Sequence, residues 1–303
     1  MNRPPVSDAA SAFRSGFVAV LGRPNVGKST LVNRLVGRKV SITSDHPQTT
    51  RRRISGVVTR EHDQIVLLDL PGFQKPFDSL TRRMQTTVNE TLTEVDAALL
   101  MLNAAEPFGG GDRFIAAAVA AAQVPAVVAL NKVDLVSRRS LAERLDEARA
   151  LVPDTPLFAV SALKGDGLPD LLARLAEAMP VGPVYFPDGQ TSDQPLEAIV
   201  GELVREQALR VTREEVPHAI AVEVESITER SDRELIEIEA SVIVESDSQK
   251  VIVVGKAGAV VKEIGSAARR EIERLLGVHV FIALRVKVRK RWRRDESYID
   301  RML

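Results

Sequence analysis

The chain has 303 residues, a length that allows two domains of roughly 150 residues each. Its 41 basic and 41 acidic residues cancel, so the net charge points to no class of partner. The absence of cysteine excludes disulfides, thiolate catalysis and cysteine-based zinc sites.

The N-terminal segment, residues 1–15, is polar, rich in small residues and contains prolines. It has no apolar core followed by a cleavage site, so it does not resemble a signal peptide. No other stretch approaches the roughly 20 apolar residues that span a bilayer. We predict a disordered tail on a cytoplasmic protein.

Residues 16–180 alternate short apolar runs with helical periods. The predicted strands are Phe17–Leu21, Arg52–Thr59, Gln64–Leu70, Asp96–Leu102, Pro125–Leu130 and Pro156–Val160. The predicted helices are Lys28–Val36, Leu80–Glu94, Asp112–Ala121, Ser140–Leu151 and Leu168–Ala178. This alternation predicts an α/β domain with a mostly parallel sheet that is covered by helices on both faces.

Residues 181–195 break this rhythm with prolines and glycines, which predicts an interdomain linker. Residues 196–303 then follow a different order, which predicts a separate α+β domain. Its predicted helices are Leu196–Leu209 and Ala259–Leu276, and its predicted strands are Ala219–Glu225, Leu235–Val244, Val251–Val254 and Val278–Val288.

A phosphate-binding loop is predicted where the first strand ends and the first helix begins. The pattern Gly22-x-x-x-x-Gly27-Lys28-Ser29 lets backbone N–H groups surround phosphate oxygens at a helix N-terminus. Lys28 would contact the β and γ phosphates, and the Ser29 hydroxyl would ligate Mg²⁺. The residues predicted to hold the nucleotide here are Gly22, Arg23, Pro24, Asn25, Val26, Gly27, Lys28, Ser29 and Thr30.

The third predicted strand ends in Asp69-Leu70-Pro71-Gly72. A carboxylate at this position can hold Mg²⁺ through a water, and the Gly72 N–H is placed to sense the γ-phosphate. In the preceding loop a threonine hydroxyl could complete the Mg²⁺ coordination. Thr50 is the preferred candidate, and Thr49 is the alternative.

The base is predicted to be guanine, because Asn131-Lys132-Val133-Asp134 follows the apolar strand Pro125–Leu130. The Asp134 carboxylate can accept from the N1–H and N2–H₂ groups of guanine, which adenine does not present together. Ser161-Ala162 follows the strand after that, where a backbone N–H could donate to the guanine O6.

Phe73 stands where Ras-like GTPases carry the glutamine that orients the attacking water. Its side chain can neither orient water nor move a proton, so we expect hydrolysis to be slow or to use another group. Asn25 is a candidate ligand for K⁺ beside the phosphates, although an asparagine there could equally well only shape the turn. The residues expected to act in hydrolysis are Lys28, Thr50, Gly72 and Asn25.

An RNA-binding surface is predicted around Gly255-Lys256-Ala257-Gly258, a GxxG pattern typical of KH domains. A tight β–α turn is the alternative. The surrounding sequence is strongly basic, as expected for a partner with a phosphate backbone, and anionic lipid is its rival. Trp292 could stack on a base or pack within its own domain. The predicted RNA-binding residues are Gly255, Lys256, Ala257, Gly258, Lys262, Arg285, Lys287 and Arg289.

Nearly the whole chain resembles the Era family of bacterial ribosome-assembly GTPases. Beyond the general GTPase motifs, the specific stretches are Ser41–Ser44, Pro47–Arg51, Asp193–Pro195, Val204–Glu206, Arg213–Pro217 and Val286–Val288. The resemblance implies a Ras-like domain joined to a KH domain of the second topological type. A departure is Leu70, where the family usually has threonine.

The resemblance further implies binding of GTP or GDP with Mg²⁺, binding of the 3′ end of small-subunit ribosomal RNA, and assistance in maturation of the small ribosomal subunit. It implies some peripheral contact with the membrane, and nothing in the sequence requires more than a monomer. The rival function is a membrane-recruited regulatory GTPase whose basic domain binds lipid. A tRNA-modifying relative is a third reading, which would need further domains.

Overall fold

Apolar strands with helices between them form the sheet of the first domain. The computed structural model describes residues 12–73, 76–230 and 234–303. The sheet has the order β2-β3-β1-β4-β5-β6, and only the β2–β3 pair is antiparallel. The strands are β1 (Arg14–Leu21), β2 (Ile54–Thr59), β3 (Asp63–Asp69), β4 (Ala97–Asn103), β5 (Ala126–Asn131) and β6 (Leu157–Ala159).

Helices cover both faces of this sheet because its strands are apolar on both sides; every residue of β3 and β4 is buried. One apolar cluster includes α1 and α5, and the other includes α2, α3 and α4. The helices are α1 (Lys28–Val36), α2 (Ser79–Leu92), α3 (Gly110–Ala122), α4 (Arg138–Leu151) and α5 (Leu168–Ala178). The predicted α/β architecture is confirmed, and the loops after β1, β3, β5 and β6 meet at one edge of the sheet.

The first strand begins earlier than predicted. Arg14 is paired with Asp63 of β3 and with Val181, and Ser15 is fully buried. The prediction of a disordered tail is therefore wrong for residues 14 and 15, whose pairing partner lies far along the chain. Residues 1–11 lie outside the described part of the chain.

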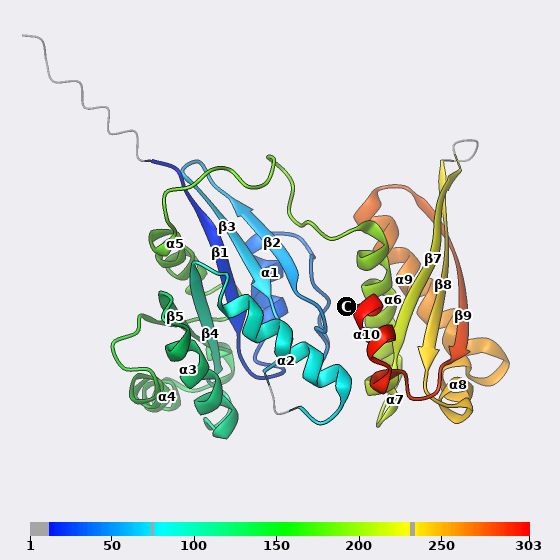
Figure 1. Ribbon diagram of the computed structural model, residues 1–303, viewed down its shortest axis with the longest axis horizontal. Coiled ribbons are helices and arrows are strands. Elements are labelled where there is room, and N and C mark those ends of the chain that lie inside the picture. Colours follow the sequence, from blue (N-terminus) through cyan, green and yellow to red (C-terminus); the bar gives the residue numbers. More distant parts are fainter. Residues whose placement is uncertain (1–11, 74–75, 231–233) are drawn as a thin grey trace, which may run out of the picture.

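The segment between the domains is fastened to the first sheet. The Gln64 side chain accepts hydrogen bonds from the backbone N–H groups of Tyr185 and Phe186 and donates to the carbonyl of Phe186. Val57 of β2 donates to the Thr191 carbonyl at 2.9 Å. The Ser55 hydroxyl donates to Asp193 at 3.0 Å. The chain then crosses to the second domain as an extended segment (Figure 1).

The second domain has a sheet of order β7-β8-β9, in which β7–β8 is antiparallel and β8–β9 is parallel. The strands are β7 (Ala221–Arg230), β8 (Leu235–Val244) and β9 (His279–Val288). The helices are α6 (Leu196–Val211), α7 (Val216–Ala219), α8 (Asp247–Val254), α9 (Ala259–Leu276) and α10 (Glu296–Met302). The long helices α6 and α9 lie together on one side of this sheet (Figure 1), which confirms the predicted α+β class. Within the described residues, no helix has the length and apolar character needed to cross a membrane.

The predicted strand at Val251–Val254 is wrong, because these residues form the last turn of α8. The Ser246 side chain caps this helix by accepting from the Gln249 N–H at 3.3 Å. A short apolar run does not distinguish a strand from a helix end. Here the Ser246 cap favours the helix.

A fourth apolar cluster joins the two domains. Trp292 is 1% exposed, and its indole N–H donates to the Ala219 carbonyl at 2.8 Å. It shares the cluster with Leu80 and Met84 of α2 and with Tyr298 of α10. In Figure 1, α10 lies on the side of the second domain that faces the first. The hypothesis that Trp292 stacks on a base is therefore wrong. Trp292 packs on its own domain, as the alternative predicted, and also against α2 of the first domain.

Candidate nucleotide site and nucleic-acid surface

The loop between β1 and α1 has the backbone that the phosphate-binding pattern predicts. Gly22 and Gly27 have φ values of 155° and 100°. A Cβ atom on Gly27 would lie 2.4 Å from the Asn131 side-chain nitrogen, so only glycine fits. The helix that follows begins at Lys28 and presents its N-terminus to this loop. Such a concave backbone at a helix N-terminus suits an anion.

Two side chains of this loop are held by the protein itself. Arg23 forms ion pairs with Glu106 at 2.6 Å and with Asp112 at 2.9 Å, which directs its guanidinium toward the start of α3. Asn25 adopts a positive φ of 62° and donates to the Asp45 carbonyl at 2.6 Å. Asn25 therefore shapes the turn and also ties it to the following loop.

Lys28 lies over the phosphate-binding loop and is only 6% exposed. Its ammonium donates to the carbonyls of Gly22 and Arg23, both at 3.2 Å. Burial lowers the pKa of Lys28 to about 8, and the nearby Asp69 carboxylate opposes that shift. A phosphate arriving here would supply the missing counter-charge.

We expect nucleotide affinity to depend on pH through Lys28. Anionic phosphates raise the pKa of Lys28. At a pH where Lys28 of the free protein is neutral, nucleotide binding is therefore accompanied by uptake of a proton by Lys28. With a free pKa of about 8, affinity for GDP should fall about fourfold between about pH 6.5 and about pH 8.5. Titration calorimetry in two buffers of different ionisation enthalpy measures the proton uptake. Lys28→Arg is the control, since its guanidinium does not titrate in this range; equal wild-type affinity at both pH values would contradict the assignment.

Three side chains predicted to hold the metal come together beneath the loop. The fully buried Asp69 accepts from the Ser29 hydroxyl at 2.6 Å and from the Thr50 hydroxyl at 3.4 Å. The two hydroxyls are 3.0 Å apart. Ser41, which was not among the predicted ligands, also donates to Asp69 at 2.6 Å.

The second oxygen of this carboxylate tests whether the site fits Mg²⁺. Asp69 Oδ1 is buried and has no hydrogen-bond partner among the described residues. Burial raises the pKa of Asp69, while Lys28 and the hydroxyls of Ser29, Ser41 and Thr50 oppose the rise. An unsatisfied carboxylate oxygen beside two hydroxyls is a set of hard donors that suits Mg²⁺. The residues therefore fit this ion.

The segment after β3 lies against the phosphate-binding loop. A Cβ atom on Gly72 would lie 2.8 Å from the Pro24 ring, so Gly72 permits this close approach. The neighbouring Leu70 is fully buried. Phe73 is 3% exposed and its ring packs against Phe114 at 5.0 Å, so it is turned into the apolar core.

Asn131 joins the candidate base site to the phosphate site. Its side-chain nitrogen donates to the Val26 carbonyl at 2.8 Å, and its oxygen accepts from the Ala162 N–H at 2.9 Å. The side chain therefore holds two loops together. Lys132 adopts a positive φ of 65°, and Asp134 follows half-exposed in a short 3₁₀ turn.

The predicted contact from Ser161-Ala162 to the guanine O6 stays a prediction. The Ser161 N–H donates to the Asp166 carbonyl at 3.0 Å, and the Ala162 N–H donates to Asn131. Both groups therefore have acceptors within the protein, and a donation to the base would have to share or replace one of them.

The loop of residues 38–53, here called the switch loop, contacts the metal site on one side and α6 on the other. Ile42 is buried in the apolar cluster of the second domain. The Thr43 N–H donates to the fully buried Glu206 at 3.1 Å, and Arg205 donates to the Thr49 carbonyl. Arg51 donates to the Ile220 carbonyl at 2.6 Å. Sequence reasoning missed these contacts, because the partners lie more than 150 residues apart.

The GxxG turn precedes α9 and has two different glycines. A Cβ atom on Gly255 would lie 2.5 Å from the Val260 side chain, so the fold itself requires this glycine. Gly258 has φ 78° with no atom within 4 Å of where its Cβ would be. Open space at Gly258 leaves room for a ligand backbone. Lys256 and Lys262 are both exposed beside this turn.

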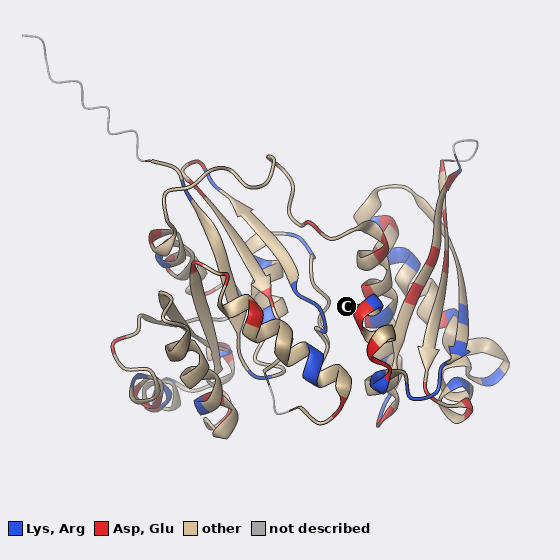
Figure 2. Ribbon diagram, in the orientation of Figure 1, with Lys and Arg blue, Asp and Glu red and all other residues tan. Residues whose placement is uncertain are grey.

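Neighbouring acidic residues partly neutralise the predicted RNA-binding residues at the end of β9. Lys287 pairs with Glu225 of β7 at 2.6 Å, and Arg285 lies 3.9 Å from both Glu225 and Glu239. Arg289 pairs with Asp295 at 2.7 Å. Figure 2 shows acidic and basic segments side by side on these strands.

The candidate RNA-binding residues fall on two surfaces. Ile282 and Leu284 face Gly265 of α9, so the alternating Arg285 and Lys287 lie on the opposite face of the sheet. The GxxG turn and α9 lie on the helical side. The strand period therefore places the β9 cations on the opposite face of the sheet from the turn.

Comparisons with known proteins match each of the two domains to a protein family. Residues 17–132 match the family described as 50S ribosome-binding GTPase, and residues 215–293 match the KH domain family. A structure of Era in complex with MgGDPNP and nucleotides 1506–1542 of 16S ribosomal RNA is similar, with 37% identity and a TM-score of 0.92. The match covers 96% of this chain and 98% of that one. A variant of Aquifex aeolicus Era bound to GDP and AlF₄⁻ gives 37% identity and a TM-score of 0.92, with 96% and 99% covered.

Proposed function

Since the chain belongs to the Era family, we propose that it is a GTP-hydrolysing switch that binds small-subunit ribosomal RNA near its 3′ end and assists biogenesis of that subunit. The switch loop is the observation that carries this proposal. The Thr50 hydroxyl lies against the metal site, while the backbone of Thr49 and the side chain of Arg51 are bound by the second domain. A change at the γ-phosphate therefore acts directly on contacts of the KH domain.

The protein's own residues position the nucleotide for hydrolysis. The loop from Gly22 to Ser29 holds the phosphates and Lys28 offsets their charge. Ser29, Thr50 and Asp69 would hold Mg²⁺, which when bound would offset negative charge on the phosphate oxygens. Gly72 brings a backbone N–H toward the γ-phosphate. Phe73 supplies no polar group for the water, because its ring is in the core, so the intrinsic rate is slow.

A monovalent cation beside Asn25 is the group we propose for accelerating this step. The side-chain nitrogen of Asn25 donates to the Asp45 carbonyl. The amide oxygen is the atom of this side chain that would bind the cation. Turnover should be roughly tenfold or more faster in K⁺ than in Na⁺ at equal ionic strength, as added positive charge at the phosphates lowers the barrier. Asn25→Ala should remove most of the difference; equal rates of the wild type in both salts would contradict the proposal.

The RNA part of the proposal is tested with an oligonucleotide that matches the 3′ end of small-subunit ribosomal RNA. Gly258→Asp places a carboxylate where the phosphate backbone would pass, so we expect RNA affinity to fall about tenfold or more. Fluorescence anisotropy measures binding, and phosphate release with and without the oligonucleotide measures coupling to GTP.

Gly277→Asp is a matched control for this variant. Gly277 ends α9, has φ 72°, and has no atom within 4 Å of its Cβ position, so both variants meet similar backbone strain. Only Gly258→Asp should lose RNA. Undiminished RNA binding by that variant, or binding lost equally in both, would contradict the assignment. Loss of binding to anionic vesicles with RNA binding intact would support the rival lipid-binding function.

We further propose that the protein works as a cytoplasmic monomer with peripheral membrane contact. The resemblance to Era supports this part. The ion pairs on β9 weaken the case for a lipid-binding sheet, because Lys287 and Arg289 already have carboxylate partners.

A further inference from the structure

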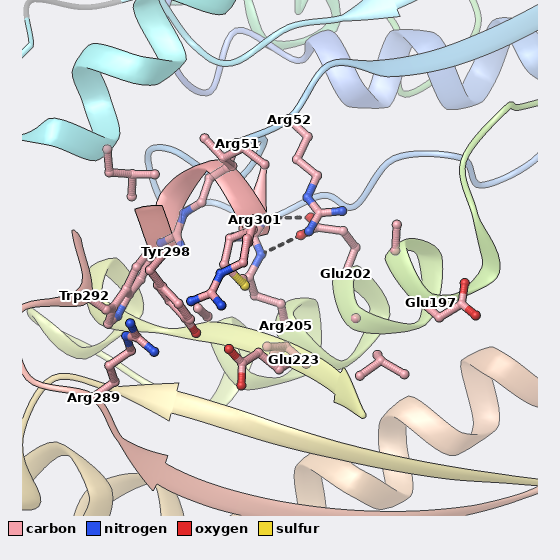
Figure 3. A pocket seen from close by; sticks show the side chains of 18 of the residues that line it. Arg51, Arg52, Glu197, Glu202, Arg205, Glu223, Arg289, Trp292, Tyr298 and Arg301 are labelled. Atoms are coloured by element: carbon pink, nitrogen blue, oxygen red, sulfur yellow. Dashed lines mark hydrogen bonds and ion pairs between the residues drawn. The ribbon is translucent and has the colours of Figure 1, made fainter. Parts of the chain in front are cut away.

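A cavity of about 460 Å³ lies between the two domains, lined by the switch loop, α6, β7 and α10. Figure 3 shows arginines from these different elements surrounding it. None of the loop residues from Gly22 to Ser29 lines it, so it is separate from the nucleotide site. The arginines are Arg51, Arg52, Arg205, Arg289 and Arg301.

Two of these arginines are buried with a donor left over. Arg51 is 6% exposed; its two terminal nitrogens donate to the carbonyls of Ile220 and His218. Arg205 is 2% exposed, and it binds Glu202 through Nε and Nη2. Arg51 Nε and Arg205 Nη1 have no hydrogen-bond partner among the described residues. Buried donors of this kind are rare in native proteins and point to a missing acceptor.

Arginines outnumber glutamates in the lining of the cavity. Three glutamates line it with the five arginines; Glu202 is paired with Arg205, and Arg289 is paired with Asp295, which lies outside the lining. In the described part of the chain, Arg52 and Arg301 form no ion pair within 4 Å. Burial, and then the charge of Arg205, lower the pKa of Arg51 to about 9. The cations therefore destabilise one another, and an anion would relieve that repulsion.

We propose that this interdomain cavity binds a small phosphate-bearing molecule, such as a sugar phosphate or nucleoside phosphate. Arginine is the side chain that best matches a phosphate, because its planar fork can donate two hydrogen bonds to it. The volume lies in the range of pockets that hold small ligands rather than single ions. Arg52 and Arg301 would contact the phosphate, and the buried guanidiniums of Arg51 and Arg205 supply positive charge behind them.

Occupancy of this site is coupled to the nucleotide site. Arg51 directly follows Thr50, and Arg205 donates to the Thr49 carbonyl. A phosphate that orders these two guanidiniums therefore restrains the segment that carries the Thr50 hydroxyl. By linkage, the ligand and GTP must affect each other's affinity by the same factor.

The test uses the full-length protein saturated with GDP and Mg²⁺, so that the phosphate-binding loop is occupied. Pyrophosphate and ribose 5-phosphate are the probes, titrated by calorimetry at constant ionic strength. We expect one site for each chain. The double variant Arg52→Gln/Arg301→Gln should bind about tenfold or more weakly, because it removes charge-assisted contacts. Arg139→Gln, at an exposed arginine of α4, is the matched control and should bind as the wild type does.

A variant that is expected to bind more tightly distinguishes an effect of charge from a loss of binding through misfolding. Glu223 lines the cavity, and Glu223→Gln removes a repulsive carboxylate, so it should tighten binding about threefold or more. Loss in the arginine variant together with gain in Glu223→Gln supports the proposal. Equal binding by all variants, or no binding once GDP and Mg²⁺ are present, overturns it. The assignment to a small molecule would be overturned if an oligonucleotide with a terminal phosphate displaced pyrophosphate and ribose 5-phosphate did not.

Discussion

Replacing Asp134 with asparagine is expected to weaken GTP binding by roughly 10²–10⁴-fold, since two hydrogen bonds to a charged acceptor are lost or reversed. In the predicted base site, the carboxylate of Asp134 would accept from both N1–H and N2–H₂ of guanine. An asparagine can accept from only one of them and presents an N–H₂ group to the other, so the N2–H₂ group of guanine meets a donor. Calorimetry with GDP and GTP measures the loss.

Xanthosine nucleotides provide the rescue for this variant. Xanthine keeps the N1–H group and carries a carbonyl in place of N2–H₂, so the asparagine amide can pair with both. The variant should therefore prefer the xanthosine nucleotide over GTP, reversing the preference of the wild type. Asp154→Asn makes the same change at an exposed position away from the site and should bind GTP normally. Weak binding of both nucleotides by Asp134→Asn would instead indicate a damaged loop.

Replacing Trp292 with alanine is expected to destabilise the second domain by about 3–5 kcal/mol, the usual cost of removing a large buried aromatic side chain. The indole contacts residues of both domains, so their mutual packing should loosen as well. Denaturation followed by circular dichroism should show the second domain unfolding at lower denaturant, separated from the first.

Two further variants define the origin of that loss. Trp292→Phe keeps a ring but removes the bond to Ala219, and should cost about 1–2 kcal/mol. Phe281→Ala lies at a side chain that is 57% exposed and should change stability by less than about 0.5 kcal/mol. A loss below about 1 kcal/mol for Trp292→Ala would contradict the interdomain role.

The first domain was predictable because its signals are local. Each buried strand is an apolar run, and each helix start carries its own cue, such as the glycine loop before Lys28. The helix at Leu168–Ala178 was predicted with its observed bounds. Residues at the ends of neighbouring parallel strands meet by topology, so Ser29 and Asp69 could be placed together before their 2.6 Å contact was seen.

The contacts between the domains could not be predicted in the same way. No local pattern pairs Arg205 with the Thr49 carbonyl or places Ile42 in the core of the other domain. The acid–base pairs on the second sheet were missed for a related reason, because the partner of Lys287 is Glu225, 62 residues earlier. Their pairing depends on strand register, which a count of charges along the chain does not contain.

The fastening of the linker to the first sheet limits how the KH domain can travel. Within the described residues, the last hydrogen bond that fastens the linker to the first sheet joins Ser55 and Asp193, and α6 begins at Leu196. The leash between them is three residue steps, which span at most roughly 11 Å when fully extended. While the hydrogen bonds of the linker to the first sheet are intact, the KH domain can rotate but stays close to that sheet. Its effective concentration beside the switch loop is therefore high. Because this segment is short, the weak hydrogen bonds between the switch loop and the second domain can break and form again quickly when the bound nucleotide changes.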